Sequence, residues 1–324
     1  MKKSFAPLLI LLFMVQPLFG QDGTIISRER FDLMNRRELG ERIFDFENET
    51  WILKPEYEYL SRVITERIIY ESDGLKITGY IAYPEDSVSC PVIIYNRGGN
   101  REFGSLNTAK IAFILAKLAG SGYVVIGSQY RGTDGSEGME EFGGKDIHDV
   151  LNLLPVVENL PHADPERIGI YGWSRGGMMT YLTLMQSDRF KAAVVGGGLT
   201  DLTMMKDTRP EMEEVYFDLI PGYARDSKKC LDERSAVLHV QKLPVKTPIL
   251  VLHGTADWRV IPEMALAFSG KLLAHKIPHR LVLFEGGDHG ILEFRDEVDE
   301  MVLEWFDRYV KNEAPLPNMD PHGR

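Results

Sequence analysis

Cysteine is scarce in this chain of 324 residues, which has only Cys90 and Cys230. Two cysteines form at most one bridge, so a disulfide framework is excluded as the source of stability. Whether the two are paired stays open, and two separate thiols are the expectation. The chain also lacks an H-E-x-x-H motif and any clustered cysteine–histidine set. We therefore expect neither a catalytic metal nor another cofactor.

Long apolar runs are confined to the N-terminus. The apolar stretch 8–15 follows Lys2 and Lys3 and ends before Gln21, which is typical of a secretory signal peptide cleaved after Gly20. The stretch is too short for a membrane span, and no later run approaches the roughly 18 apolar residues that a span requires. The sequence thus predicts an exported protein, periplasmic or secreted, without a stable membrane anchor.

Net positive charge is absent as well. Lysine and arginine number 37 against 48 aspartates and glutamates, which gives a formal charge of −11. Proteins that bind nucleic acid neutralise phosphates with clustered basic residues. We therefore expect no nucleic-acid partner.

Short apolar runs alternate with helical patterns along most of the chain. This alternation predicts an α/β-hydrolase fold, in which helices cover both faces of a mostly parallel, twisted sheet. A hairpin with a turn at Asp73 and Gly74 is expected to precede the parallel strands. The expected buried strands are 91–95, 123–127, 167–171, 192–195, 248–254 and 280–284.

The chain is expected to divide into three parts after residue 20. Residues 21–60 form a helical extension, 61–312 the hydrolase domain and 313–324 a tail. Within the domain, 199–247 interrupts the alternation and is expected to form a small lid over the strand ends. Five residues of this insertion are candidates for the wall of a substrate pocket, or else pack the lid onto the body: Met204, Met205, Tyr216, Phe217 and Tyr223.

A glycine-flanked serine lies between an expected strand and an expected helix, in the sequence G-W-S-R-G-G at 172–177. This context is that of a nucleophile elbow, although a glycine-rich turn with an idle serine is the alternative. Ser174 would be the nucleophile and Trp173 a substrate contact. The Arg175 N–H would bind the oxyanion, and a second donor would come from Arg97 or Gly98.

Two partners for the serine follow the ends of later strands. Because the carboxyl ends of parallel strands meet at one edge of a sheet, Ser174, Asp257 and His289 should lie close together. His289 would take the serine proton, and Asp257 would fix the imidazole tautomer. Asp201 remains the alternative acid. His253 is expected to face the core and support the Asp257 loop.

The motif at 172–177 resembles the nucleophile motif of the prolyl oligopeptidase family of serine peptidases, and the segments 130–138, 253–260 and 286–290 resemble it too. The resemblance covers about 61–312. It implies an α/β-hydrolase domain with a triad of Ser174, Asp257 and His289 that cleaves short peptides through an acyl-enzyme.

Two departures from the family pattern leave the substrate open. Family peptidases typically carry an N-terminal β-propeller, whereas only residues 21–60 lie between the predicted signal peptide and the domain. Several members have a tyrosine in the first oxyanion loop, where this chain has Arg97. A carboxylic ester hydrolase, acting on small or carbohydrate esters, is therefore the alternative function, and a non-catalytic binding protein on the same scaffold is a third. The sequence does not determine the oligomeric state.

Overall fold

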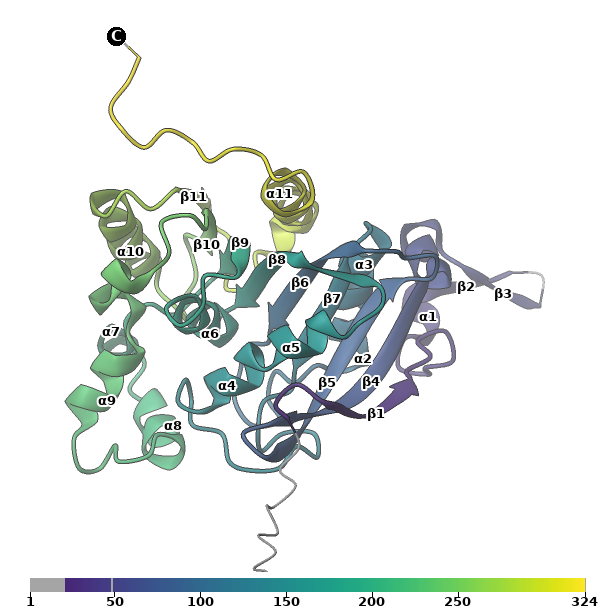
Figure 1. Cartoon of the computed structure of the whole chain (residues 1–324), viewed down its shortest axis with the longest axis horizontal. Coiled ribbons are helices and arrows are strands. Elements are labelled where there is room, and N and C mark those ends of the chain that lie inside the picture. The colour runs from purple at the N-terminus through teal and green to yellow at the C-terminus, as the bar shows by residue number, and fades with distance from the viewer. Residues whose placement is uncertain (1–20, 48, 324) are drawn as a thin grey trace, which may run out of the picture.

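A computed structural model describes residues 21–47 and 49–323 (Figure 1). The predicted signal peptide, 1–20, lies outside the described residues, so export stays a prediction. None of the described helices combines the length and the apolar character that a membrane span needs.

The described part of the chain contains a single large sheet of nine strands, in the order β1-β4-β5-β7-β6-β8-β9-β10-β11. Its first four strands pair antiparallel, and all pairs from β7 to β11 are parallel. This arrangement confirms the predicted α/β fold with a mostly parallel sheet. The strands are β1 (Ile25–Arg30), β4 (Val63–Ser72), β5 (Leu75–Pro84), β6 (Cys90–Asn96), β7 (Val124–Ser128), β8 (Ala163–Trp173), β9 (Phe190–Gly196), β10 (Ile249–Gly254) and β11 (His279–Phe284).

Helices cover both faces of the sheet, and each face has its own apolar core. Strands buried on both faces have nearly continuous apolar sequences, as β6, β7 and β10 do here. One face carries α4 (Asp146–Leu151), α5 (Leu153–Glu158), α6 (Arg175–Leu184) and α10 (Pro262–Ala274). The other face carries α2 (Thr108–Lys110), a π-helical segment (Ile111–Ala116), α3 (Lys117–Gly120), α11 (Arg295–Phe306) and a terminal π-helical turn (Asp307–Lys311).

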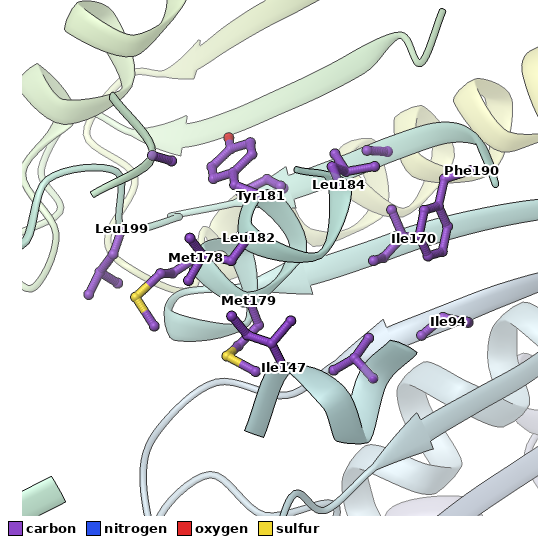
Figure 2. Packing of buried hydrophobic residues seen from close by; sticks show 14 of the residues in the cluster. Ile94, Ile147, Ile170, Met178, Met179, Tyr181, Leu182, Leu184, Phe190 and Leu199 are labelled. Carbon is purple, nitrogen blue, oxygen red and sulfur yellow. The ribbon is translucent and has the colours of Figure 1, made fainter. Parts of the chain in front are cut away.

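Helix α6, which follows the candidate nucleophile, is buried along its whole length. Figure 2 shows its Met178 and Met179 packed among neighbours that include Ile147 of α4 and Ile170 of β8. A helix enclosed in this way has little freedom to shift. Its N-terminus therefore holds Ser174 in a fixed place relative to the strand ends.

The prediction of a helical extension at 21–60 is wrong. Strand β1 pairs with β4 at the edge of the main sheet, and β2 (Phe44–Glu47) forms a small hairpin with β3 (Thr50–Leu53). Helix is limited to one turn, α1 (Gly40–Ile43), and a 3-10 segment at Pro55–Arg62. The aromatic residues of this region have no helical period, and the open edge of β4 offers backbone partners to a strand.

The insertion at 199–247 folds into three short helices, α7 (Leu202–Thr208), α8 (Met212–Leu219) and α9 (Ser227–Arg234), followed by 3-10 turns at Ala236–Leu238 and Val240–Lys242. These helices gather at one end of the molecule (Figure 1). Of the five candidate wall residues, Met205 alone lines the active-site pocket described below. The others are core or surface residues, because Tyr216 and Tyr223 are buried, Met204 packs against the core and Phe217 is exposed.

Cys90 and Cys230 are both unpaired, with Cys230 buried and Cys90 partly so. Among the residues that the structure describes, no group of three or more histidine, cysteine, aspartate or glutamate side chains could hold a metal ion.

Candidate active site

Ser174 occupies a sharp turn between β8 and α6, with φ 60° and ψ −125°. A non-glycine residue with positive φ is strained, as a nucleophile elbow requires. Close contacts explain the glycines on either side. A Cβ atom at Gly172 would lie 2.1 Å from the Gly176 oxygen, and one at Gly176 would lie 2.0 Å from the Asn96 oxygen. The turn can therefore form only where both positions lack a side chain.

The serine hydroxyl is free for chemistry. Ser174 is the N-cap of α6, but its side chain makes no capping hydrogen bond. Arg175 begins the helix, so its N–H has no acceptor within the helix and lies at the positive end of the helix dipole. This is the position of the predicted first oxyanion donor.

The backbone of Gly98 lies directly against the nucleophile. A Cβ atom at Gly98 would lie 3.2 Å from the Ser174 Cβ and 2.8 Å from the Trp173 oxygen. Gly98 and Arg175 both line the pocket that contains Ser174. Because only a glycine allows this approach, the loop after β6 can present a backbone N–H to the site.

The side chain of Arg97, the residue found in place of the family tyrosine, does not line the pocket that contains Ser174. It is fully buried on the other side of the loop. Its Nε donates to the Gln129 oxygen at 2.9 Å, and its Nη2 donates to the Thr133 hydroxyl at 3.0 Å. Arg97 thus anchors the oxyanion loop, and only its backbone N–H stays a candidate donor.

Asp257 is hydrogen-bonded to His289, a pairing that the chain order predicts. The distance from the Asp257 Oδ2 to the His289 Nδ1 is 2.7 Å. The other oxygen, Oδ1, accepts hydrogen bonds from the backbone N–H groups of Arg259 and Val260 at 2.9 and 3.0 Å. Burial opposes the charge on Asp257, but hydrogen bonds with His253 and His289 outweigh it and hold the pKa of the carboxyl well below its usual range. Asp257 is therefore an ionised, fixed partner for the imidazole.

His253 supports this carboxylate from the core, as expected. It is completely buried, and its Nε2 lies 2.7 Å from the Val260 oxygen and 3.3 Å from the Asp257 Oδ2. Both neighbours are acceptors, so Nε2 must carry the proton. The opposite nitrogen, Nδ1, is buried without a partner among the described residues.

His289 is held in place by Trp173, whose indole N–H donates to the His289 backbone oxygen at 2.8 Å. Trp173 therefore positions the His289 backbone and also lines the pocket, where it stays a candidate substrate contact. Ser174 and His289 line the same pocket, and the Ser174 hydroxyl has no hydrogen bond to another described side chain. Serine–imidazole bonds are commonly completed only when a substrate is bound.

Neither Asp201, the alternative acid, nor Asp288, the neighbour of His289 in the sequence, is hydrogen-bonded to the imidazole. Asp201 caps α7 by accepting a hydrogen bond from the Met204 N–H at 2.9 Å. Asp288 accepts from the backbone N–H groups of Gly290 and Ile291 at 2.7 and 2.9 Å. Both serve local backbone structure.

A buried ionic cluster connects the elbow to the oxyanion loop, and the sequence did not reveal it. The Arg175 Nη1 lies 2.6 Å from the Glu140 Oε1 and donates to the Gly99 oxygen at 2.9 Å. The Glu140 Oε2 in turn accepts from the Arg101 N–H at 2.9 Å. Asp146 completes the pairing of the Arg175 guanidinium. No sequence pattern marks Glu140 or Asp146, because only the fold brings them beneath the elbow.

The pocket around Ser174 has a volume of about 350 Å³. A serine on a strained elbow, an imidazole bonded to a carboxylate and two backbone donors are together suited to acyl transfer. The walls are largely apolar and aromatic. Its charged lining residues are Lys110, Arg175, Arg209, Arg259 and Arg295, of which only Arg175 was a candidate site residue from the sequence.

Comparisons with known proteins agree with this geometry. The model of the prolyl oligopeptidase family matches residues 110–313. A solved puromycin-hydrolyzing peptidase from Mycobacterium tuberculosis superimposes with a TM-score of 0.68 at 25% identity, covering 81% of this chain and 41% of that one.

Two curated peptidases are similar in sequence. The uncharacterized peptidase YtmA of Bacillus subtilis is 29% identical over 206 residues, which cover 63% of this chain and 78% of that protein. Dipeptidyl-peptidase 5 of Porphyromonas gingivalis is 25% identical over 259 residues, which cover 76% of this chain but only 38% of the relative. Because the family model extends over more than half of the sequence, this chain belongs to the prolyl oligopeptidase family and is a serine-type peptidase.

Proposed function

We propose that this peptidase cleaves short peptides through an acyl-enzyme formed on Ser174. The observation that carries the proposal is the 2.7 Å hydrogen bond between Asp257 and His289. His289 lines the same pocket as Ser174 on its elbow. The remaining pocket groups favour the same chemistry, since backbone donors at Gly98 and Arg175 flank the nucleophile.

The reaction follows from the position of each group. The Ser174 Oγ attacks the peptide carbonyl carbon while the His289 Nε2 takes its proton. The oxyanion is stabilised by the Arg175 N–H and by a donor from the loop after β6, at Gly98 or Arg97. His289 then donates its proton to the departing amine, and the Asp257 carboxylate stabilises the imidazolium. A water molecule, activated by His289, releases the acid from Ser174.

The size of the pocket favours short substrates. A volume of about 350 Å³ lies at the small end of ligand pockets, and the mostly apolar walls suit a few substrate side chains.

We also propose export, on the strength of the apolar stretch 8–15 behind Lys2 and Lys3. N-terminal sequencing of the protein from its natural source should find Gln21 as the first residue, and a retained stretch 1–20 would contradict export.

Paired kinetics test the peptide assignment. The purified protein is assayed on a short-chain p-nitrophenyl ester and on a panel of dipeptide and tripeptide amides, blocked and unblocked, with Ser174→Ala as the blank. We expect turnover of at least one amide, because His289 can protonate an amine leaving group. Ester turnover with no amide cleavage would contradict the peptide assignment and favour a carboxylic ester hydrolase.

A further inference from the structure

Every charged side chain that lines the active-site pocket is basic. The lining includes Lys110 and four arginines, and contains neither aspartate nor glutamate. The sign of the charge in the pocket is thus opposite to that of the whole chain, whose formal charge is −11. A pocket with one sign of charge concentrates ligands of the other sign.

Three of these cations are already paired with carboxylates. Arg175 is neutralised by Glu140 and Asp146 in the buried cluster. The Nε of Arg209 lies 2.9 Å from Glu211, and the Nε of Arg295 lies 3.0 Å from Asp299. These arginines therefore contribute less net charge to the pocket than their number suggests.

Arg259 and Lys110 have no carboxylate partner among the described residues. The Arg259 guanidinium packs on the Trp258 ring, 5.4 Å from its centroid. Among the same residues, Lys110 has neither a carboxylate nor an aromatic ring against it. Its ammonium donates to the Gly104 backbone oxygen, and the side chain is partly buried. Burial, and then the like charge of Arg97, lowers the pKa of Lys110 to about 8. An ammonium held in a pocket without a counterion is costly, and an anionic ligand would offset that cost.

We propose that Lys110 binds a carboxylate of the peptide substrate, so that the enzyme prefers acidic substrates. This inference rests on the proposed function and names its substrate class. The carboxylate is either the side chain of an aspartate or glutamate on the acyl side, or the free C-terminal carboxylate of the leaving peptide. Conversely, the described pocket offers no carboxylate to a substrate ammonium.

Two matched pairs of substrates separate the sources of the carboxylate. The first pair is a blocked dipeptide 7-amido-4-methylcoumarin with glutamate or glutamine on the acyl side. The second is a blocked tripeptide with a free C-terminal carboxylate or a C-terminal amide, followed by mass spectrometry. In the pair that matches the true source of the carboxylate, we expect kcat/KM to be about 10- to 100-fold higher for the anionic member. This range corresponds to the free energy of a hydrogen bond between charged groups.

Variants then assign the preference to Lys110. We expect Lys110→Gln to bring the anionic-to-neutral ratio of kcat/KM close to one and Lys110→Arg to retain most of it. Lys271→Gln is the control, because Lys271 is an exposed lysine of α10 outside the pocket and its loss changes the net charge equally.

The pH profile provides a readout that a purely structural lysine would not change. The lysine is charged below its pKa, so the ratio should fall as the pH rises through about 8. Arg97 lies close enough to act on Lys110, and the other charged or titratable groups of the pocket are His289, Tyr95, Tyr171, Arg175, Arg209, Arg259 and Arg295. Burial raises the pKa of both tyrosines, so they stay neutral near pH 8. The arginines stay charged, and any effect of His289 acts on both members of a pair and cancels in the ratio. With Lys110→Arg the fall should disappear.

The possible failures are distinguishable. Ratios near one in both pairs, with peptides still cleaved, would overturn the carboxylate site and leave the proposed function intact. A preference that survives Lys110→Gln would overturn the role of this residue. If no peptide is cleaved while esters are, the proposed function itself fails.

Discussion

Ser174→Ala should lower kcat on the best peptide amide by about 10⁶-fold, because no other group can form the acyl-enzyme. The fold should survive. The Ser174 side chain makes no capping bond, and the backbone keeps the same strained φ of 60° with either residue. Measurement of kcat together with a urea unfolding curve separates loss of chemistry from loss of structure.

Ser61→Ala is a suitable control for this substitution. Ser61 is exposed and donates only to the nearby Glu58 backbone oxygen. We expect it to keep the activity of the unaltered protein. If Ser174→Ala retained even a hundredth of the original kcat, Ser174 could not be the nucleophile.

Asp257→Asn should lower kcat by about 10⁴-fold, the typical cost of losing the triad carboxylate. The Asn amide group can donate to the His289 Nδ1, which would place the imidazole proton on Nε2. That nitrogen could then no longer accept the serine proton. Because the pKa of Asp257 lies well below its usual range, its carboxylate stays ionised in neutral and mildly acidic solution. We therefore expect the same loss at every pH from about 5 to 9.

Asp201→Asn is the matched control, since Asp201 is the alternative acid in the sequence. The structure uses Asp201 as the N-cap of α7, and asparagine caps helices about as well as aspartate. We expect kcat within about threefold of the unaltered protein, with little change in stability. An equally large loss in both variants would contradict the assignment of Asp257.

Much of the fold was predictable because buried parallel strands leave a plain signal. Strands β6 to β11 appear as short apolar runs, and their order along the chain places Ser174, Asp257 and His289 past strand ends. Residues 21–60 gave no such signal. Strand β1 forms because β4 has an open edge, and that depends on a partner distant in the sequence.

The active site, too, was predictable from the sequence only in part. The elbow could be recognised because a glycine-flanked serine between a strand and a helix is a local pattern, although Gly176 also contacts the distant Asn96. The direction of the Arg97 side chain could not, because it depends on Gln129 and Thr133 in another loop. Lys110 and Arg295 were missed for a similar reason, since they come from helices that meet only in the folded chain.

The central claim is that Ser174 is the nucleophile, and covalent labelling tests it most directly. The protein is treated with a fluorophosphonate, digested with trypsin and analysed by mass spectrometry. The expected tryptic peptide 168–175 contains Ser174 as its only serine. We expect a single adduct on this peptide and none in Ser174→Ala. An adduct on a different peptide, or none on a protein that still cleaves peptides, would contradict the mechanism.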